Sequence, residues 1–403
     1  MEDVQAHSAR AQTITLSVFR MRVLHVYKDV YPPIRGGIEQ HIDAIRTALP
    51  DLQHDVLACA RKFRTRQSTS PSDDGREVLV GELGRVLSTP IAPTFPLWLA
   101  RLAHGAIVHL HMPQPLAELS VVATRVRSPV VISYHTDIYR QRALLFLYRP
   151  LVIRALRRAD VVITGSERLR ASSPLLREAG VRAEVVPYGI DVDRWAPERA
   201  DPAAVKELRA RYGHPHVLAV GRLVHYKGFN QLIAAARKLP YSVVIVGEGP
   251  ARGDLERQVL RSGVGKSVHL VGEVSDHRLA DHLAAASLFA LPSTNRAEAF
   301  GISLLEAQAA ELPVIATDVG TGTVEAFRPG CSGYLIPANN EDALFHAISE
   351  MMRRPDCRRA MGKSGRRLVE AHYSLERMAQ ALRPLYSDLW FRSFDGGRQA
   401  APH

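Results

Sequence analysis

The segment His216–Gly249, HVLAVGRLVHYKGFNQLIAAARKLPYSVVIVGEG, decides the fold class of this chain. It begins with a short apolar run, passes through a loop with two cations, and then repeats apolar residues at helical spacing over 229–239. A second apolar run, SVVIVG, follows directly. A strand, a helix and another strand in succession form a parallel pair with a right-handed crossover, so the segment predicts a βαβ unit.

The same alternation of strand-like and helical segments extends in both directions from this unit. Downstream, the strand-like runs are VHLVGEV, SLFALPS, PVIATDV and GYLIPA. Upstream, they are RVLHVY (22–27), DVLACA (55–60), AIVHLH (106–111), PVVISYH (129–135), DVVITGS (160–166) and AEVVPYG (183–189). A turn-rich stretch with two prolines, 189–204, separates the two series. The sequence therefore predicts an α/β protein with two doubly wound, Rossmann-like parallel-sheet domains.

The length of 403 residues agrees with two domains of about 150–200 residues each. We expect a first domain over 21–190 and a second over 191–374. Residues 1–20 are interpreted as a loose extension or a misassigned start, because Met21 opens the first strand-like run. The chain ends with a predicted helix over 374–390 that carries one apolar stripe.

Composition narrows the class of protein. The content of 46% hydrophobic and 23% charged residues is typical of soluble globular proteins, and no apolar run reaches the roughly 18 residues that a membrane-spanning helix needs. The three cysteines form neither a zinc-binding spacing nor a disulfide framework. This cysteine usage favours a reducing compartment, and hence a cytoplasmic location.

The formal net charge of +11 is concentrated in the first half, where residues 1–190 carry 25 Lys and Arg against 17 Asp and Glu. An excess of this kind suggests an anionic partner such as a membrane surface, a nucleic acid or a phosphorylated substrate. An arginine-rich composition without functional meaning is the alternative, since only 7 of the 52 basic residues are lysines.

Two carboxylates stand eight residues apart in AEAFGISLLEA, at Glu298 and Glu306. Eight helical residues span about 12 Å, which is longer than the roughly 5–9.5 Å between the paired carboxylates of glycosidases. The spacing suits two carboxylates that bind different parts of one extended ligand, each accepting hydrogen bonds from hydroxyls. The alternative is a capping glutamate followed by an exposed helical one.

Phosphate-binding signals follow several predicted strands, where ligands of open parallel sheets bind. Gly221 ends one strand, and Arg222 and Lys227 in the next loop suit a diphosphate, although two solvated loop cations would look the same. Gly36 and Gly37 after the first strand can turn backbone N–H groups toward a phosphate, but glycines are common in such turns. The segment VGTGTVEAF (319–327), expected to open a helix, is another candidate anion site.

Three histidines and two short motifs are the remaining candidates for binding sites. His135 at a strand end could bond a substrate hydroxyl or phosphate, or be structural. We expect His109 and His111 on opposite faces of their strand, so that they do not share a metal ion. GEGPARG (247–253) lacks the spacing of a dinucleotide-binding loop, and DVD (191–193) lies in the expected linker, so we predict neither a nicotinamide site nor a metal site.

The order of these motifs resembles that of family 4 retaining glycosyltransferases, which have the GT-B architecture of two Rossmann-like domains facing a cleft. The resemblance covers about residues 21–390. It rests on Gly36–Gly37, His135, VVPYGIDVDRW, GRLVHYKGF, VGEGP, PSTNRAEAFGISLLEAQA and TDVGTGTVEAFRPGCSGYLI. MRVLHVYKDVYPPIRGGIEQHI and SYHTDIYRQRALLFLYRPL are further similar to a bacterial branch of mannosyl- or rhamnosyltransferases.

The resemblance implies that Arg222 and Lys227 hold a nucleotide diphosphate and stabilise it as it leaves. Glu298 would bind donor-sugar hydroxyls, Glu306 the ribose, and His135 the sugar near its reacting carbon. The remaining implied donor contacts are Gly36, Gly37 and Gly221 near the phosphates, Phe300, Gly301 and Ile302 at the sugar–phosphate junction, and Glu273, within 271–274, near the base. The final helix would cross back, adding about 375–403 to the first domain.

The implied reaction is retaining transfer of a hexose from a nucleotide diphosphate sugar, with GDP-mannose favoured, to a lipid-linked or saccharide acceptor. Front-side attack through an oxocarbenium-like state would let the leaving phosphate take the acceptor proton, with no metal ion or other cofactor. A nucleotide-sugar epimerase, a phosphorylase and a non-catalytic nucleotide-sugar-binding protein are the alternatives, and no nucleic acid is expected as a partner. Tyr188 and Thr321 depart from the family, which often has Asn and Gly at these positions.

The segment 139–158, YRQRALLFLYRPLVIRALRR, mixes arginines with leucine, phenylalanine and tyrosine. It could rest on an anionic bilayer, placing the protein peripherally on the inner face of the plasma membrane. A core helix with exposed arginines and a kink near Pro150 is the alternative.

Overall fold

The computed structural model describes residues 20–69, 75–86, 89–124, 126–137 and 142–395. The predicted extension at 1–20 and the end of the chain from 396 therefore lie almost wholly outside the described residues, as does the start of the 139–158 segment.

The first domain is built on a sheet with the strand order β10-β9-β8-β7-β1-β2-β4-β3. All pairs are parallel except that of β3 with β4. Its strands are β1 Arg22–Val26, β2 Gln53–Cys59, β3 Arg66–Thr69, β4 Arg76–Val80, β7 Ile107–Met112, β8 Val130–Tyr134, β9 Val161–Thr164 and β10 Ala183–Val185, and β5 Arg85–Val86 and β6 Thr89–Pro90 form a small separate hairpin. The antiparallel edge and the hairpin were not predicted.

Helices cover both faces of this sheet. They are α1 Gly37–Ala48, α2 Phe95–Ala103, α3 Pro115–Thr124, α4 Arg142–Arg158, α5 Glu167–Ser172 and α6 Pro174–Ala179. One face packs against α2 to α6 through an apolar core, and the other packs against α1. Strands covered on both faces read as continuous apolar runs, which is why their positions could be read from the sequence.

The second domain has a fully parallel sheet in the order β13-β12-β11-β14-β15-β16. Its strands are β11 His216–Val220, β12 Ser242–Val246, β13 Val268–Gly272, β14 Leu288–Leu291, β15 Val314–Asp318 and β16 Gly333–Pro337. Its helices are α7 Pro202–Tyr212, α8 Phe229–Ala236, α9 Arg252–Arg261, α10 Asp276–Ala285, α11 Ile302–Ala309, α12 Glu341–Arg353 and α13 Pro355–His372, again on both faces. Counted from β11, this is the strand order of a dinucleotide-type Rossmann fold, with its switch point between β11 and β14.

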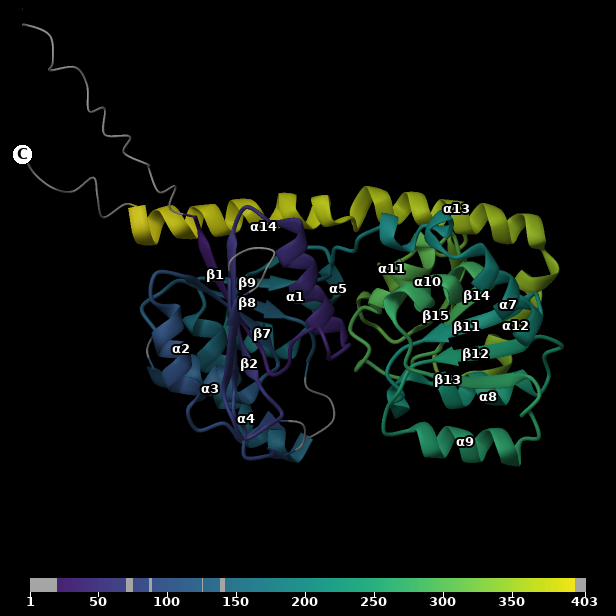
Figure 1. Cartoon of the computed structure of the whole chain (residues 1–403), viewed down its shortest axis with the longest axis horizontal. Coiled ribbons are helices and arrows are strands. Elements are labelled where there is room, and N and C mark those ends of the chain that lie inside the picture. The colour runs from purple at the N-terminus through teal and green to yellow at the C-terminus, as the bar shows by residue number, and fades with distance from the viewer. Residues whose placement is uncertain (1–19, 70–74, 87–88, 125, 138–141, 396–403) are drawn as a thin grey trace, which may run out of the picture.

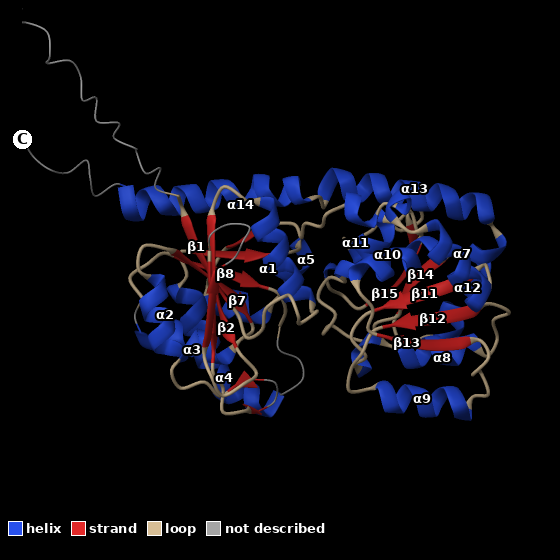
Figure 2. Ribbon diagram, viewed as in Figure 1, coloured by secondary structure: helices blue, strands red, loops and turns tan. Residues whose placement is uncertain are grey.

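The two sheets face one another through the ends of their strands (Figure 2). The prediction of two doubly wound Rossmann-like domains is confirmed. The helix expected within 319–327 is wrong, because only the single 3₁₀ turn Gly322–Val324 forms there.

The last helix returns to the first domain, as expected. It is α14, Leu375–Trp390, and Figure 1 shows it running with α13 along one side of both domains. Its apolar stripe, which includes Met378, Leu382 and Tyr386, packs on the α1 face of the first sheet. The chain passes between the two domains twice, once after β10 and once after α13. The two connecting segments contact each other, because the N–H of Ile190 in the first donates to the carbonyl of Tyr373 in the second at 2.9 Å.

Candidate active site

A buried ion pair lies at the switch point of the second sheet. Lys227 follows β11 and Glu298 follows β14, and the Lys227 Nζ lies 2.7 Å from Glu298 Oε2. Ser293 Oγ donates to the same carboxylate oxygen at 2.9 Å. The side chains are only 12% and 7% exposed. Their placement on the two strands that flank the switch point is where an open α/β sheet binds its ligand.

The ion pair keeps Lys227 protonated although its side chain is buried. Burial alone lowers the pKa of Lys227, but Glu298, together with smaller contributions from Tyr226 and Glu306, outweighs burial, and the pKa lies above its ordinary value. Glu306 adds to this effect from a second direction. Lys227 is therefore cationic at neutral pH, and both glutamates act on the same ammonium group.

Glu306 lies on the inner face of α11 and is buried. Burial, together with the nearby Asp276, raises its pKa to about 7. The interpretation of Glu298 and Glu306 as a cap and an exposed helical residue is therefore wrong.

The turn before α11 depends on Gly301. Its φ of +84° is strained for other residues, and a Cβ there would lie 2.7 Å from Leu291 Cδ2. This residue lets the chain reverse between Glu298 and the helix that carries Glu306.

The first domain brings its glycine turn to the same place. Gly36 is the N-cap of α1, and a Cβ at Gly37 would lie 3.7 Å from Ile302 Cδ1 of the second domain. The side chain of Arg222 is exposed, and its charge reaches Glu39 of α1. Burial raises the pKa of Glu39, while positive charge from Lys28 and Arg222 opposes that shift. Glu39 was not singled out from the sequence, although only Ile38 separates it from the glycines.

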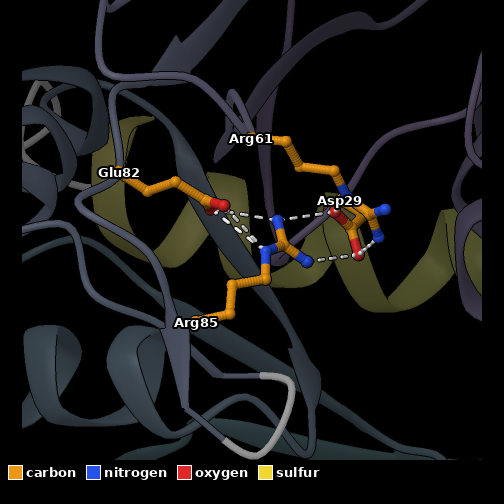
Figure 3. A network of polar contacts seen from close by, with 4 residues as sticks. All are labelled: Asp29, Arg61, Glu82 and Arg85. Carbon is orange, nitrogen blue, oxygen red and sulfur yellow. Dashed lines mark hydrogen bonds and ion pairs between the residues drawn. The ribbon is translucent and has the colours of Figure 1, made fainter.

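A network of two arginines and two carboxylates holds the loop that leads from β1 to these glycines (Figure 3). Asp29, 3% exposed, accepts hydrogen bonds from Arg61 at 2.9 Å and from Arg85 at 2.8 Å, and Arg85 also bonds Glu82 at 2.9 Å. Burial raises the pKa of Asp29, but these hydrogen bonds hold it below its ordinary value. The network is neutral as a whole, so it fixes the loop without adding net charge beside the site.

The same loop also contacts the second domain, at the segment that follows β13. Tyr31 Oη donates to Asp276 Oδ2 at 2.5 Å, and Arg35 forms an ion pair with Asp276 at 3.0 Å and a hydrogen bond to the carbonyl of Val274. Arg35 also lies 3.8 Å from Glu273, which is largely exposed. These contacts bring first-domain side chains over the segment that was expected to face the base.

His135 lies just beyond β8 at the end of a chain of buried histidines. Its Nε2 lies 3.1 Å from His111 Nδ1, and its Nδ1 lies 3.0 Å from the Tyr188 hydroxyl. Both ring nitrogens therefore have protein partners, so a direct hydrogen bond from this ring to a sugar stays a prediction.

The expectation for His109 and His111 is wrong. Residues two apart on a strand share a face, and the two rings stack with centroids 4.3 Å apart. With His25 of β1, they place ligand atoms within 4.8 Å of one another. The alternation of strand side chains, applied correctly, would have predicted this cluster.

Three further residues of the sequence motifs contact other parts of the protein. Thr321 donates to the backbone carbonyl of Glu298 at 2.6 Å, so its hydroxyl supports the turn. Arg296, which is half-buried, donates to the hydroxyl of Ser172 in the first domain at 2.7 Å. Gly249 of the GEGPARG segment lets the backbone approach Leu223 closely, because a Cβ there would lie 2.4 Å from the Leu223 carbonyl oxygen.

Comparison with known proteins decides the family. The model for Glycosyltransferase Family 4 matches residues 35–194, and that for Glycosyl transferases group 1 matches 202–368. O-antigen chain mannosyltransferase C of Escherichia coli is 30% identical over 372 residues, covering 92% of this chain and 99% of that protein. The chain belongs to glycosyltransferase family 4.

Other relatives of the transferase include D-rhamnosyltransferase WbpZ of Pseudomonas aeruginosa, 32% identical over 88% of this chain and 91% of that protein. A GDP-mannose-dependent phosphatidylinositol monomannoside mannosyltransferase of Mycobacterium tuberculosis is 30% identical over 90% and 97%. Among solved structures, sucrose-phosphate synthase of Thermosynechococcus elongatus has a TM-score of 0.77 at 22% identity, covering 93% of this chain and 100% of that one. The protein is therefore an enzyme of the transferase class, rather than an epimerase or a non-catalytic binding protein.

Proposed function

We propose that the transferase moves a hexose, with the mannose of GDP-mannose as the first candidate, from a nucleotide diphosphate sugar to a saccharide or lipid-linked acceptor. The anomeric configuration is retained, and no metal ion takes part. The observation that carries the proposal is the buried Lys227–Glu298 pair at the switch point, opposite Gly37 of the first domain. The printed names of the mannosyltransferase relatives support the choice of sugar, and one of them names GDP-mannose.

The charges of the site fit a diphosphate leaving group. Lys227 is a buried cation, and a charge in a buried site interacts more strongly than in solvent. Arg222, exposed on the same loop, adds the forked donor that suits phosphate oxygens. Together they would stabilise the negative charge that develops as the bond between sugar and phosphate breaks.

The carboxylates fit the neutral parts of the donor. Glu298 would accept hydrogen bonds from sugar hydroxyls, and Glu306 from the ribose, with Phe300, Gly301 and Ile302 between them at the sugar–phosphate junction. Glu273 would lie near the base. With its hydroxyls held on one side, the donor can be attacked from the side of its leaving phosphate, which takes the proton of the acceptor.

A screen of donors tests the proposal most directly. Thermal shifts with GDP, UDP, ADP and dTDP should single out one nucleotide, and we expect GDP. The corresponding sugars are then incubated with lipid-linked saccharide extracts, and the anomeric configuration of the product is read by NMR. An inverted product contradicts retention, and loss of activity in EDTA contradicts metal independence. Glu298→Ala should abolish transfer while weakening nucleotide binding only in part, with exposed Glu207→Ala on α7 as the control.

The surface formed by α2, α3 and α4 of the first domain favours a peripheral membrane location. Among the described residues, no helix is both long and apolar enough to cross a bilayer. Helix α3 packs between α2 and α4, and these helices expose Leu97, Leu119 and Phe146. Exposed Arg101 and Arg154 lie on α2 and α4, a combination that suits an anionic lipid surface.

Vesicle flotation tests this location. The full chain should float with anionic vesicles at low salt and be released at high salt, and Leu97→Ser with Phe146→Ser should weaken binding. Leu260→Ser, equally exposed on α9 of the second domain, is the matched control. Absence of binding to anionic vesicles removes the membrane proposal and leaves the transfer proposal in place.

A further inference from the structure

The first sheet contains a continuous chain of buried hydrogen bonds that ends at the domain interface. It crosses the sheet perpendicular to its strands, from β2 through β1 and β7 to the end of β8. The bonded pairs are His54 Nε2 with the carbonyl oxygen of Leu49 at 2.9 Å, His25 Nε2 with His54 Nδ1 at 3.0 Å, His25 Nδ1 with His111 Nε2 at 3.2 Å, His111 Nδ1 with His135 Nε2 at 3.1 Å, and His135 Nδ1 with Tyr188 Oη at 3.0 Å.

The carbonyl at one end sets the direction of every bond in the chain. A carbonyl oxygen only accepts, so His54 must carry its proton on Nε2, and in a neutral ring its Nδ1 is an acceptor. His25 must then donate from Nε2 and accept at Nδ1. The same reasoning passes through His111 to His135, whose Nε2 donates and whose Nδ1 accepts.

Neutral rings are the state that burial favours. The four histidines are between 0% and 5% exposed, and burial disfavours an imidazolium ion. Burial holds the pKa of His25, His111 and His135 well below its ordinary value. A chain of neutral rings with one proton each satisfies every nitrogen named above.

We propose that His54, His25 and His111 are positioning residues that hold His135 as its Nε2–H tautomer and so make the Tyr188 hydroxyl a donor to His135. Tyr188 is thereby fixed where its ring meets Phe300 of the second domain, with centroids 4.8 Å apart. Phe300 begins the stretch assigned to the sugar–phosphate junction. The catalytic consequence rests on the proposed function, whereas the tautomer assignment does not.

The tautomers can be measured on the native full-length chain without any donor. With ¹⁵N-labelled histidine, long-range ¹H–¹⁵N correlation spectra distinguish a protonated ring nitrogen from an unprotonated one. We expect protonated Nε2 and unprotonated Nδ1 for all four histidines, assigned by single substitutions. A protonated Nδ1 in any of them overturns the proposal.

A metal ion is the other occupant that this cluster could take, because His25, His109 and His111 bring ligand atoms within 4.8 Å. A metal held there would take the place of the proton between His25 and His111. Metal analysis of the purified protein distinguishes the two states. One bound ion per chain overturns the proposal, and its absence together with the expected tautomers supports it.

Interrupting the chain gives the second test. In His25→Phe, the Nε2–H of His111 loses its acceptor, so we expect His111 to move its proton to Nδ1 and donate to His135. His135 must then donate from Nδ1 to Tyr188, which reverses its tautomer. His216→Phe is the matched control, since His216 is also buried on the first strand of its sheet, with Nδ1 bonded to Gly213 at 2.8 Å. An unchanged His135 spectrum in His25→Phe overturns the proposal.

The activity of the same variants tests the catalytic consequence. Misplacement of a positioned group costs on the order of 10²-fold in rate, and we expect a loss of kcat of that size in His25→Phe, with a smaller change in donor KM. His216→Phe should keep kcat near the native value. A reversed tautomer with native kcat overturns the positioning role, whereas absence of transfer by the native chain counts against the proposed function and leaves the spectra to decide the tautomers.

Discussion

Lys227 and Glu298 form an ion pair across 2.7 Å although they lie 71 positions apart in the sequence and on loops after different strands. The order of the strands makes this possible, because β11 and β14 are neighbours in the sheet. The pair is buried, so removing one member leaves the other without compensation.

Loss of the cation should therefore be costly. We predict that Lys227→Met lowers the free energy of unfolding by about 3–5 kcal/mol at pH 7, because a buried carboxylate is left unpaired. Urea denaturation measures the change. Lys238→Met breaks an ion pair with Asp342 that is exposed, and this control should unfold close to the native midpoint. Equal effects of the two substitutions would contradict the buried pair's importance.

Glu306 gives the site a dependence on pH. Its pKa in the folded chain, about 7, lies above the ordinary 4.5, so folding takes up a proton between these values. The contribution of Glu306 to the free energy of unfolding is present below pH 4.5 and is lost as the pH rises through about 7.

Nucleotide binding should reverse that shift. Ribose hydroxyls that donate to Glu306 favour the carboxylate, so we predict that nucleotide binding near pH 7 releases a proton. Calorimetry in buffers with different ionisation enthalpies measures the release. It should vanish in Glu306→Gln and persist in Glu207→Gln, whose side chain is exposed on α7. Release that is unchanged in Glu306→Gln would place its source elsewhere.

Gly301 should tolerate no side chain. Its φ is +84° and a Cβ would lie 2.7 Å from Leu291, so we predict that Gly301→Ala lowers stability and transfer together. Gly330→Ala separates the two causes, because Gly330 has a φ of +77° with nothing within 4 Å of its Cβ position. This control should cost only the conformational part, about 1–2 kcal/mol. Denaturation and initial rates of both variants provide the comparison.

The returning helix should contribute strongly to the stability of the first domain. Tyr386 of α14 is fully buried, and its hydroxyl lies 2.6 Å from His109 Nδ1. We predict a loss of about 3–5 kcal/mol in Tyr386→Ala from the lost ring, and about 1 kcal/mol in Tyr386→Phe from the hydrogen bond alone. A variant series with equal losses would show that the hydroxyl, and not the packed ring, carries the effect.

Much of the fold could be predicted because each parallel strand is covered on both faces and so forms an apolar run. The edge strand β3 escaped prediction because its four residues, RQST, are all exposed and show no apolar alternation. The segment 319–327 forms only the turn Gly322–Val324, because Gly320 has a φ of +70°, which a right-handed helix does not contain, and glycine and threonine are poor helix formers. Its Glu325 accepts hydrogen bonds from the backbone N–H groups of Glu167 and Arg168 in the first domain.

The residues of the candidate site likewise include some that the sequence could predict and some that it could not. Lys227 and Glu298 could be found because chemistry-bearing residues at strand ends meet at one sheet edge. The contact of Tyr31 and Arg35 with Asp276 could not, because it joins two domains whose relative placement no local pattern encodes. Nor could the sequence show that Thr321 turns toward Glu298, since either a ligand or a backbone carbonyl can accept from its hydroxyl.

The hydrogen bond between Ile190 and Tyr373 has a mechanical consequence. Both segments that join the two domains meet at this hydrogen bond, on the side of α14, so a rotation of one domain against the other would turn about this point. A rotation about that point would separate Tyr31 and Arg35 from Asp276 and would leave the hydrogen bond between Ile190 and Tyr373 in place. A bulky sugar nucleotide would then enter from the rim away from the pivot and leave by the same route.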